Sequence, residues 1–381
     1  MNILVNAIPL TGLLTGIARY VRNVYTCLEQ EQNVKVGYFT GKHIEQNMPV
    51  QNGHESWIIK NNRLRRLPEA AMFALRSAHW LNYERMLRRA VVQKGTFDVY
   101  HETGFIPAKL SDLPVIYTMY DLSLRHYAYA HPKERVWFFE FFIKRRLPQA
   151  GHILTISEYI RQEIIDELKV PPEKVTAIPL APDPHFAPRS QEQIDHTLKR
   201  LGLPKEFILF TGTLEPRKNI DLLINALPLM EYDLPLVLAG WSGWGEKAWQ
   251  ESIAAKCLEH RVIQTGYVDE EDLACLYSGA RVFVYPSMYE GFGLPVLEAM
   301  ACGCPVITSN VSCLPETAGD AAELTDPHIP EQLALHLDHI VQDDHLAQTL
   351  SAKGLDRAAS FSWKHTAHKT LRVFNSVQKS G

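Results

Sequence analysis

The sequence predicts an α/β protein made of two parallel-sheet domains, and three observations lead to this prediction. Short apolar runs alternate with longer amphipathic segments, which is the pattern of β-α-β units whose parallel strands are covered by helices. Residues 178–190 contain four prolines and few periodic apolar residues, which is typical of a linker between domains. The length of 381 residues fits two or three domains. We therefore predict a first domain over residues 1–182 and a second domain over residues 183–361.

Apolar runs rich in β-branched and aromatic residues are the predicted strands of both sheets. In the first domain these are Ile3 to Ala7, Val34 to Phe39, Asp98 to His101, Val115 to Met119, Ile153 to Ser157 and Val175 to Pro179. In the second domain they are Phe207 to Gly212, Leu236 to Ala239, Val262 to Thr265, Val282 to Tyr285 and Val306 to Thr308. The segment after Phe361 is amphipathic, which predicts a last helix over residues 362–381.

Composition places the chain among ordinary soluble globular proteins, since 46% of its residues are hydrophobic and 22% are charged. A formal net charge of −4 argues against a nucleic-acid partner bound through bulk charge. The chain begins directly with a strand rather than a signal peptide, and no apolar run approaches the ~18 residues of a membrane-spanning helix. The cysteines show no CxxC pair and no zinc-finger spacing with histidines, which favours buried free thiols in a reducing compartment. We expect a cytoplasmic protein.

The stretch from Glu290 to Glu298 is where we expect the site of the second domain. It follows the predicted strand Val282 to Tyr285 and enters a helical pattern at Pro295, where a proline is tolerated because its missing N–H would have no partner in the first turn. A helix N-terminus favours anions through its free N–H groups and its dipole. The nearby Gly291 and Gly293 let a ligand approach the backbone closely.

The carboxylates at the two ends of this stretch indicate that the expected ligand carries hydroxyl groups as well as an anionic group. Glu290 lies in the turn, and Glu298 lies about one turn into the helix, where it can accept hydrogen bonds from hydroxyls further along the ligand. A phosphate between two hydroxyl-bearing groups is the chemical outline of a nucleotide sugar. The alternative is an ordinary strand–turn–helix with a solvated glutamate at each end.

This stretch, Glu290-Gly291-Phe292-Gly293-Leu294-Pro295 followed by Glu298, resembles the signature of the retaining glycosyltransferases of family four. The resemblance implies the fold called GT-B: two facing Rossmann-like domains with a central cleft, and a last helix, residues 362–381, that crosses back to the first domain. It implies that the second domain binds the nucleotide sugar and the first binds the acceptor. It also implies that Glu290 holds hydroxyls of the donor sugar and that Glu298 holds the ribose. The implied donor-binding turn between them consists of Gly291, Phe292, Gly293 and Leu294.

The loop after the first predicted strand of the second domain carries two adjacent cations, Arg217 and Lys218. Arginine makes forked contacts to phosphate oxygens, and lysine supplies a point charge. A leaving nucleoside diphosphate gains negative charge as its glycosidic bond breaks, so cations there stabilise the transition state more than the ground state. The pair resembles the Arg-Lys pair of the family, and together with Glu290 it is the predicted catalytic set. A solvated pair of loop cations is the alternative.

The sequence contains no Asp-x-Asp triplet, so a metal ion that clamps the diphosphate is not indicated. The Arg-Lys pair and the helix N-terminus can supply positive charge in its place. We expect no metal and no cofactor, with the nucleotide-sugar donor as a substrate.

Two further donor contacts are implied by the family. Gly16, in a glycine-containing loop after the first strand, matches the position that faces the diphosphate, and a plain turn between strand and helix is the alternative. Val268 matches the loop that reads the nucleobase through backbone groups. Asp269 either accepts hydrogen bonds from guanine or caps the following helix, and the sequence leaves both interpretations open.

Candidates for contacts with the acceptor or the donor sugar follow two strands of the first domain. His101 and Glu102 end a strand at the edge where open α/β sheets bind ligands, although a satisfied loop histidine and a surface glutamate are an equal alternative. Tyr120 and Asp121 stand where many relatives have His-Asp, whose histidine contacts the donor sugar. A phenol with a pKa of about 10 is a poor general base at neutral pH. This departure argues against a mechanism that needs histidine here, and we expect Asp121 to orient the loop.

Residues 60–94 carry nine lysines and arginines against two glutamates, interleaved with apolar and aromatic residues. A basic amphipathic helix that bears aromatics can lie on an anionic membrane surface. The segment Arg135 to Arg146 shows the same pattern more weakly. The alternative is that the aromatics pack in a core while the arginines form a solvated face. Peripheral contact through residues 60–94 with the cytoplasmic face of the inner membrane would fit an acceptor held in the bilayer.

The order of the pairs His101-Glu102, Tyr120-Asp121 and Ser157-Glu158 resembles bacterial O-polysaccharide mannosyltransferases of the B type, which use GDP-mannose. The resemblance implies transfer of mannose in α-1,3 linkage to a lipid-diphosphate-linked oligosaccharide in O-antigen or related polysaccharide synthesis. Three alternatives stay open: a UDP- or dTDP-sugar donor, a nucleotide-sugar epimerase or hydrolase on the same fold, and a non-catalytic partner protein. A nicotinamide dehydrogenase is disfavoured because neither half shows GxGxxG followed by an acid ~20 residues later.

Overall fold

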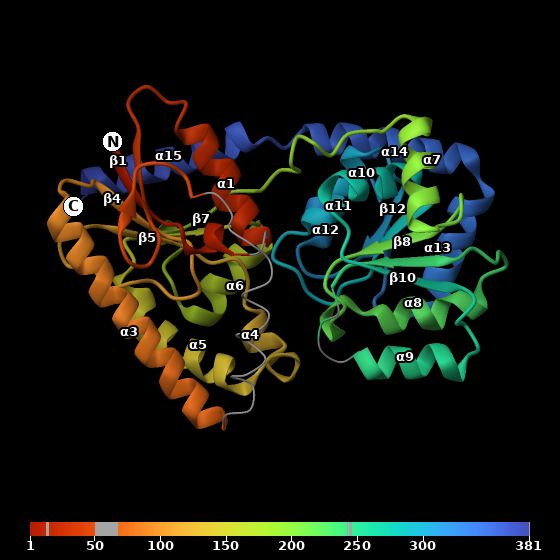
Figure 1. The fold of residues 1–381 in the computed structure, drawn as a ribbon, viewed down its shortest axis with the longest axis horizontal. Helices are drawn as coiled ribbons and strands as arrows, with labels where there is room; N and C mark the ends of the chain where they lie inside the picture. The colour runs from red at the N-terminus through yellow and green to blue at the C-terminus, as the bar shows by residue number, and fades with distance from the viewer. Residues whose placement is uncertain (13–14, 50–67, 242, 244–245, 381) are drawn as a thin grey trace. The chain divides into compact units, whose positions relative to one another are not determined.

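The computed structural model describes residues 1–12, 15–49, 68–241, 243 and 246–380, and Figure 1 shows their fold. The chain divides into two compact units. Unit 1 consists of Met1–Leu180 and Trp363–Gly381, and unit 2 consists of Ala181–Ser362. The boundary after Leu180 lies within the proline-rich stretch 178–190, which is the predicted linker.

Unit 1 is built on a seven-stranded sheet in the order β3-β2-β1-β4-β5-β6-β7. Neighbouring strands are parallel except β3, which pairs antiparallel with β2. The two central strands β4 and β5 are buried along their whole length, as expected for a parallel sheet covered by helices on both faces. The strands are β1 Asn2–Asn6, β2 Lys35–Phe39, β3 Ile44–Glu45, β4 Val99–Glu102, β5 Val115–Thr118, β6 His152–Thr155 and β7 Val175–Ala177.

The helices of unit 1 turn apolar faces to this sheet. In α1 the buried residues Val21, Val24 and Leu28 recur every three or four positions, which places them on one face. Its start is capped by Thr15, whose hydroxyl accepts a hydrogen bond from the N–H of Ala18. The helices are α1 Gly16–Leu28, α3 Glu69–Lys94, α4 Ser123–His126, α5 Lys133–Arg146 and α6 Glu158–Leu168, with short 3-10 turns η1 Ile8–Thr11, η2 Ala128–Ala130, η3 Leu147–Gln149 and η4 Pro172–Lys174.

The end of the chain completes unit 1. Helix α15, Trp363–Ser380, packs against α1 and β6, and its Ala367, Thr370 and Phe374 are buried. The hydroxyl of Thr366 donates to the carbonyl of Pro179 at 2.8 Å. The last helix therefore belongs to the same compact unit as the first 180 residues.

Unit 2 has a six-stranded, entirely parallel sheet in the order β10-β9-β8-β11-β12-β13. The chain order reverses between β8 and β11, and open α/β sheets bind ligands beyond the carboxyl ends of the strands at such a point. The strands are β8 Ile208–Thr211, β9 Leu236–Ala239, β10 Val262–Gly266, β11 Val282–Tyr285, β12 Val306–Ser309 and β13 Glu323–Thr325. The helices are α7 Gln191–Leu201, α8 Ile220–Ala226, α9 Glu246–Ala255, α10 Glu270–Gly279, α11 Leu294–Ala301, α12 Leu314–Ala318, α13 Pro330–Gln342 and α14 Asp344–Ala359, with the turns η5 Pro216–Lys218 and η6 Leu227–Leu229.

The predicted α/β class and all eleven predicted strands are confirmed, with strand ends that differ by at most two residues. Strands β3 and β13, which have two and three residues, are not predicted from the sequence. The basic stretch 60–94 is described from residue 68 onward, where it forms α3, and its residues 60–67 lie outside the described residues. None of the described helices combines the length and the apolar character that a membrane span requires.

Candidate active site

Two loops of unit 2 leave the sheet at the carboxyl ends of neighbouring strands. Strand β8 leads to the turn η5, which carries Arg217 and Lys218, and strand β11 leads to the loop with Glu290. Because β8 and β11 are parallel neighbours, both loops start from the same edge of the sheet. The backbone N–H of Met288 donates to the carbonyl of Arg217 at 2.9 Å, which holds the two loops together.

Glu290 is the centre of a buried ion cluster. Its Oε1 lies 2.6 Å from Nζ of Lys218 and 2.9 Å from Nη1 of Arg217. The other terminal nitrogen of Arg217 donates to Glu215 at 2.6 Å. The ammonium of Lys218 also donates to the hydroxyl of Tyr285, which in turn lies 3.2 Å from Oε1 of Glu290. The structure therefore brings together the three residues of the predicted catalytic set.

Burial and neighbouring charge act against each other in this cluster. Burial raises the pKa of the Glu290 carboxyl, but the charges of Arg217 and Lys218 together outweigh burial and hold the pKa at about 2. Burial also lowers the pKa of Lys218, while the charge of Glu290 opposes that shift. Glu290 is therefore ionised at neutral pH. An ionised carboxylate can accept hydrogen bonds from sugar hydroxyls, and fixed cations can bind a diphosphate.

The predicted donor-binding turn leads into α11. Gly293 is the N-cap of α11 and has φ +94°, a left-handed backbone that glycine adopts without strain. A Cβ at Gly293 would lie 2.8 Å from the side chain of Leu314. Phe292 is buried, and its carbonyl accepts a hydrogen bond from the hydroxyl of Thr317. The turn is thus fixed by packing on the residues around α12.

Glu298 lies in α11, one turn beyond its start, and is buried. The hydroxyl of Tyr277 donates to its Oε2 at 3.4 Å and lies 2.7 Å from Oγ1 of Thr211. Tyr277 lies in α10 and Thr211 lies in β8, so both residues belong to unit 2. Gly291 is buried and Leu294 is half-buried. All the predicted donor-binding residues of this turn thus lie between Glu290 and Glu298 at the start of a single helix.

The remaining donor candidates lie at other strand ends. Val268 is half-buried in the loop after β10. Asp269 accepts a hydrogen bond from the N–H of Asp272 at 2.9 Å and caps α10, which confirms the capping interpretation. The contact with guanine stays a prediction. Gly16 is the exposed first residue of α1 in unit 1. A Cβ at Gly16 would meet nothing within 4 Å, so packing within unit 1 does not require glycine there.

The prediction that His101 contacts an acceptor directly does not fit the structure, because the side chain is fully buried in unit 1. Its Nδ1 lies 2.7 Å from the hydroxyl of Tyr25 and its Nε2 lies 2.7 Å from Oγ1 of Thr118. Burial lowers the pKa of His101 to about 3. A neutral imidazole with both nitrogens engaged matches the alternative prediction of a satisfied histidine.

Glu102 is corrected in the same way, since it is fully buried and is no surface glutamate. Its Oε1 accepts hydrogen bonds from the side-chain amide of Asn6 at 2.5 Å and from the N–H of Gly104 at 2.8 Å. Its Oε2 accepts from the hydroxyls of Tyr83 and Tyr100 at 3.0 and 3.1 Å. Burial raises the pKa of Glu102 to about 7, and the hydrogen bonds only partly offset that rise. Glu102 ties the ends of β1 and β4 together and fixes the loop after β4.

Tyr120 and Asp121 follow β5 at the same edge of the sheet of unit 1. The hydroxyl of Tyr120 donates to the carbonyl of Thr103 at 3.2 Å. Burial raises the pKa of Tyr120 well above its usual value, so the phenol is neutral at physiological pH. A carboxylate oxygen of Asp121 accepts a hydrogen bond from the N–H of Ser123 at 2.9 Å, so Asp121 orients the loop into α4, as expected.

Several partners of the predicted residues are not found by sequence reasoning. Among these partners, Glu215 alone is indicated by the local sequence, because it lies two residues before Arg217, the cation with which it pairs. Tyr285 and Tyr277 come from a strand and a helix whose sequence gives no sign of a polar role. Their hydroxyls reach carboxylates that are 5 and 21 positions away.

Comparison with known proteins covers both units. The family described as "Glycosyl transferases group 1" matches residues 193–357, and the family described as "Glycosyltransferase Family 4" matches residues 14–186. The chain is 34% identical over 387 residues to O-antigen chain mannosyltransferase B from Escherichia coli. This match covers 98% of this chain and 99% of that protein. It is 33% identical over 253 residues to the serotype-specific mannosyltransferase WbdA of Escherichia coli, a match that covers 64% of this chain and 31% of WbdA.

Solved structures show the same fold. Sucrose-phosphate synthase from Thermosynechococcus elongatus superposes with a TM-score of 0.77 at 22% identity and covers 100% of this chain and 99% of that one. WaaG, a glycosyltransferase involved in lipopolysaccharide biosynthesis, superposes with a TM-score of 0.70 at 15% identity and covers 98% and 99% of the two chains. At these identities the superpositions establish the fold, and the family follows from the sequence matches.

Proposed function

This chain belongs to the group 1 glycosyltransferases of family 4, and we propose that it transfers mannose from GDP-mannose to a lipid-diphosphate-linked oligosaccharide. The proposed transfer retains the configuration of the sugar, forms an α-1,3 linkage and serves O-antigen or related polysaccharide synthesis. The observation that carries the proposal is the match over nearly the whole chain to an O-antigen mannosyltransferase. The ion cluster of Arg217, Lys218 and Glu290 supports it, because these groups suit a sugar diphosphate.

The proposed chemistry uses charges that are already fixed. Arg217 and Lys218 bind the diphosphate, whose negative charge grows as the bond to the sugar breaks. Glu290 accepts hydrogen bonds from hydroxyls of the donor sugar, and Glu298 from those of the ribose. Carboxylates and the hydroxyl of Tyr285 hold the two cations in place before any ligand arrives, so little reorganisation is needed during reaction.

The proposed transfer needs no base from the protein. The acceptor hydroxyl attacks the anomeric carbon on the face of the leaving group, the carbon–oxygen bond to the diphosphate breaks, and an oxygen of the departing phosphate takes the hydroxyl proton. Proton transfer to the departing phosphate fits a chain in which Tyr120 has a raised pKa and stands in place of a histidine. We propose that no metal takes part, because Arg217 and Lys218 supply the positive charge at the diphosphate.

We further propose that unit 1 touches an anionic membrane surface through α3 and α5, which pack against each other. These helices expose large apolar side chains, among them Leu81, Trp137 and Phe141. The guanidinium of Arg145 lies 3.9 Å from the ring centre of Phe141, which combines positive charge with an aromatic face. Co-sedimentation with phosphatidylglycerol vesicles but not with phosphatidylcholine vesicles is the expected result, and equal recovery with both would contradict this contact.

A donor screen tests the proposed substrate. The purified protein is heated without metal in the presence of GDP-mannose, UDP-glucose, UDP-GlcNAc or dTDP-rhamnose. A donor that binds only the folded state raises the melting temperature by mass action, so GDP-mannose alone is expected to raise it. Selective stabilisation by a UDP or dTDP sugar would keep the reaction class and discard mannose. No shift with any donor, in folded protein, would contradict the proposed activity.

A further inference from the structure

A pocket lies in unit 1, at the opposite edge of the sheet from His101, Glu102 and Tyr120. It has a volume of about 380 Å³ and is enclosed by the last turn of α5, the turn η3, the end of α6 and the turn η4. Ile153 at the start of β6 and Lys174 immediately before β7 are among its walls. A volume in this range suits a small molecule or part of a larger one.

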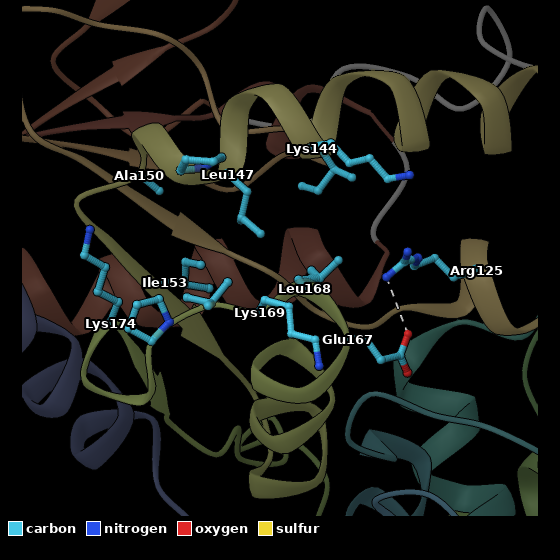
Figure 2. Close-up of a pocket in the computed structure, with 13 residues that line it drawn as sticks. Arg125, Lys144, Leu147, Ala150, Ile153, Glu167, Leu168, Lys169 and Lys174 are labelled. Carbon is cyan, nitrogen blue, oxygen red and sulfur yellow. Dashed lines mark ion pairs between the residues drawn. The ribbon is translucent and has the colours of Figure 1, made fainter.

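The pocket combines an apolar wall with cations. Ile143, Leu147, Ala150 and Ile153 are buried and form part of the apolar wall. Four cationic side chains line the same pocket against a single acid, Glu167. These cations are Arg125, Lys144, Lys169 and Lys174. Figure 2 shows the Arg125–Glu167 ion pair at one end of the pocket and Lys174 at the other.

Acids of the protein neutralise only half of these cations. Arg125 lies 2.7 Å from Glu140 and 3.5 Å from Glu167, and Lys144 lies 3.4 Å from Glu140. In the part of the chain that the structure describes, Lys169 and Lys174 take part in no ion pair. The pocket therefore keeps two ammonium groups that form no ion pair with a carboxylate of the described residues.

One side of α5 connects the pocket to exposed aromatic surface. Trp137, Phe141, Lys144 and Pro148 follow one another at spacings of four, three and four residues, which places them on one side of a helix and its continuation. Trp137 is 46% exposed and Phe141 is 44% exposed, whereas Lys144 and Pro148 line the pocket. An amphiphile that enters along this side would meet aromatic surface first, and then the cations and the apolar wall.

We propose that this pocket is a binding site for a single anionic membrane lipid. Its phosphate is bound by Lys174, while Lys169 adds positive charge elsewhere on the rim of the pocket. The first carbons of its chain lie against Leu147, Ile153 and the neighbouring apolar wall. Ammonium groups suit a phosphate because the contact is charge-assisted, and the apolar wall favours a ligand whose charged group is joined to a hydrocarbon. The inference deepens the membrane contact proposed above and rests on it only for the source of the lipid.

Short-chain lipids test the site without a membrane. Isothermal titration below the micelle concentration compares dihexanoyl phosphatidic acid, dihexanoyl phosphatidylcholine and inorganic phosphate on the full-length protein. We expect one molecule of the phosphatidic acid to bind, and the other two ligands to bind at least tenfold more weakly. The double variant Lys169→Asn/Lys174→Gln should lose at least tenfold in affinity, and asparagine is chosen at position 169 because that residue has φ +55°.

A matched control carries the same loss of charge elsewhere in unit 1. Lys35 and Lys42 are exposed and do not line the pocket, so Lys35→Gln/Lys42→Gln should bind like the wild type. Leu168 is half-buried and also lines the pocket. Leu168→Trp therefore tests the apolar wall separately and should also weaken binding. Unchanged affinity in the Lys169/Lys174 variant overturns the proposal. Equal binding of phosphatidylcholine, or of inorganic phosphate, overturns it as well, because the first means a purely apolar slot and the second a site for free anions.

The outcome is separable from the fate of the proposed transferase activity. Stabilisation by a nucleotide sugar is measured on the same variants, and the Lys169/Lys174 variant should keep the wild-type response. A protein that binds the donor but not the phosphatidic acid refutes the lipid site alone. A protein that binds the phosphatidic acid but no donor refutes the proposed transfer alone.

Discussion

At the scale of single residues, Glu290 shows how charge pairs overcome burial. Removal from water alone would favour the neutral acid, yet Arg217 and Lys218 hold its pKa at about 2, below its usual value of 4.5. A lowered pKa in the folded state means that this ionised carboxylate contributes stability above pH 4.5. That contribution is lost as the pH falls from 4.5 towards 2.

Arg217→Ala is predicted to lower turnover by roughly 10²-fold or more, as expected when a contact to the developing charge of the leaving group is removed. The variant should also be less stable, because Glu290 and Glu215 each lose a charged partner in a buried setting. Initial rates with the donor identified by the screen measure the first effect, and melting curves measure the second.

Arg200→Ala is the matched control, because Arg200 also lies in unit 2 and pairs with an acid, Asp272, but is half-exposed on the surface. Exposed ion pairs contribute little to stability, so this variant should keep both rate and melting temperature. Unchanged turnover in folded Arg217→Ala protein would contradict the role of Arg217 at the diphosphate.

Glu102 makes stability depend on pH in the opposite sense to Glu290. Its pKa in the folded protein is about 7, against 4.5 as the usual value, so between these pH values the folded state keeps a proton that the unfolded state releases. Stability therefore falls as the pH rises from 4.5 to 7, by about 3 kcal/mol at ~1.4 kcal/mol per pKa unit. Glu102→Gln, which cannot ionise, is predicted to lack this fall in urea unfolding experiments between pH 5 and 7.5.

Glu173→Gln serves as the comparison for Glu102, because Glu173 is an exposed glutamate of the same unit. The Glu173→Gln variant should show the same fall in stability as the wild type, because the change leaves Glu102 in place. If Glu102→Gln and the wild type keep a constant difference over this range, the protonation of Glu102 in the folded state is refuted.

At the scale of an element, the start of α11 is set by one backbone conformation. Gly293 has φ +94° and a close approach to Leu314, so both the turn and its packing need a residue without a Cβ. The turn in front of α11 carries Glu290, and α11 itself carries Glu298. A change at Gly293 therefore alters stability and the positions of both carboxylates together.

Gly293→Ala is predicted to destabilise the protein by about 2–4 kcal/mol, since the left-handed conformation costs roughly 1 kcal/mol and overpacking costs about 1–3 kcal/mol more. Donor affinity should fall with it. Gly202→Ala isolates the cost of the left-handed conformation, because Gly202 has φ +65° but a Cβ there would meet nothing within 4 Å. Melting curves and donor titration of both variants test this, and equal losses of stability would show that the contact with Leu314 does not matter.

At the scale of the whole molecule, the end of the chain is structurally part of its beginning. Phe374 in α15 is fully buried, and its ring meets that of His101 at 5.2 Å between ring centres. The hydroxyl of Thr366 bonds to the carbonyl of Pro179, 187 positions earlier. Unit 1 is therefore complete only when the last helix is in place.

Phe374→Ala is predicted to destabilise unit 1 by about 3–5 kcal/mol, as is usual when a buried phenylalanine is truncated to alanine. Hydrogen exchange should become faster in peptides of α1, β4 and β6. Peptides of β8 and β11 in unit 2 should exchange as in the wild type. Faster exchange throughout both units would contradict the assignment of α15 to unit 1 alone.

The sequence by itself determines the class, eleven of the thirteen described strands and three residues of the ion cluster. Apolar periodicity is a local property, so strands such as β9 and β11 are found at their correct bounds. Arg217, Lys218 and Glu290 are predicted because their residue types and the turns that carry them are local as well. The pattern of glycines and proline around Gly293 likewise predicts where α11 starts, to within one residue.

Only the tertiary structure decides which polar groups are buried and which partners they have. His101 and Glu102 end a strand in a position open to ligands by sequence, yet α1, α3 and α15 cover them with Tyr25, Tyr83 and Phe374. The pocket lined by Lys169 and Lys174 likewise draws its walls from α5, α6 and η4. Contacts between residues far apart in the chain leave no trace in local periodicity, because they arise only when the elements pack.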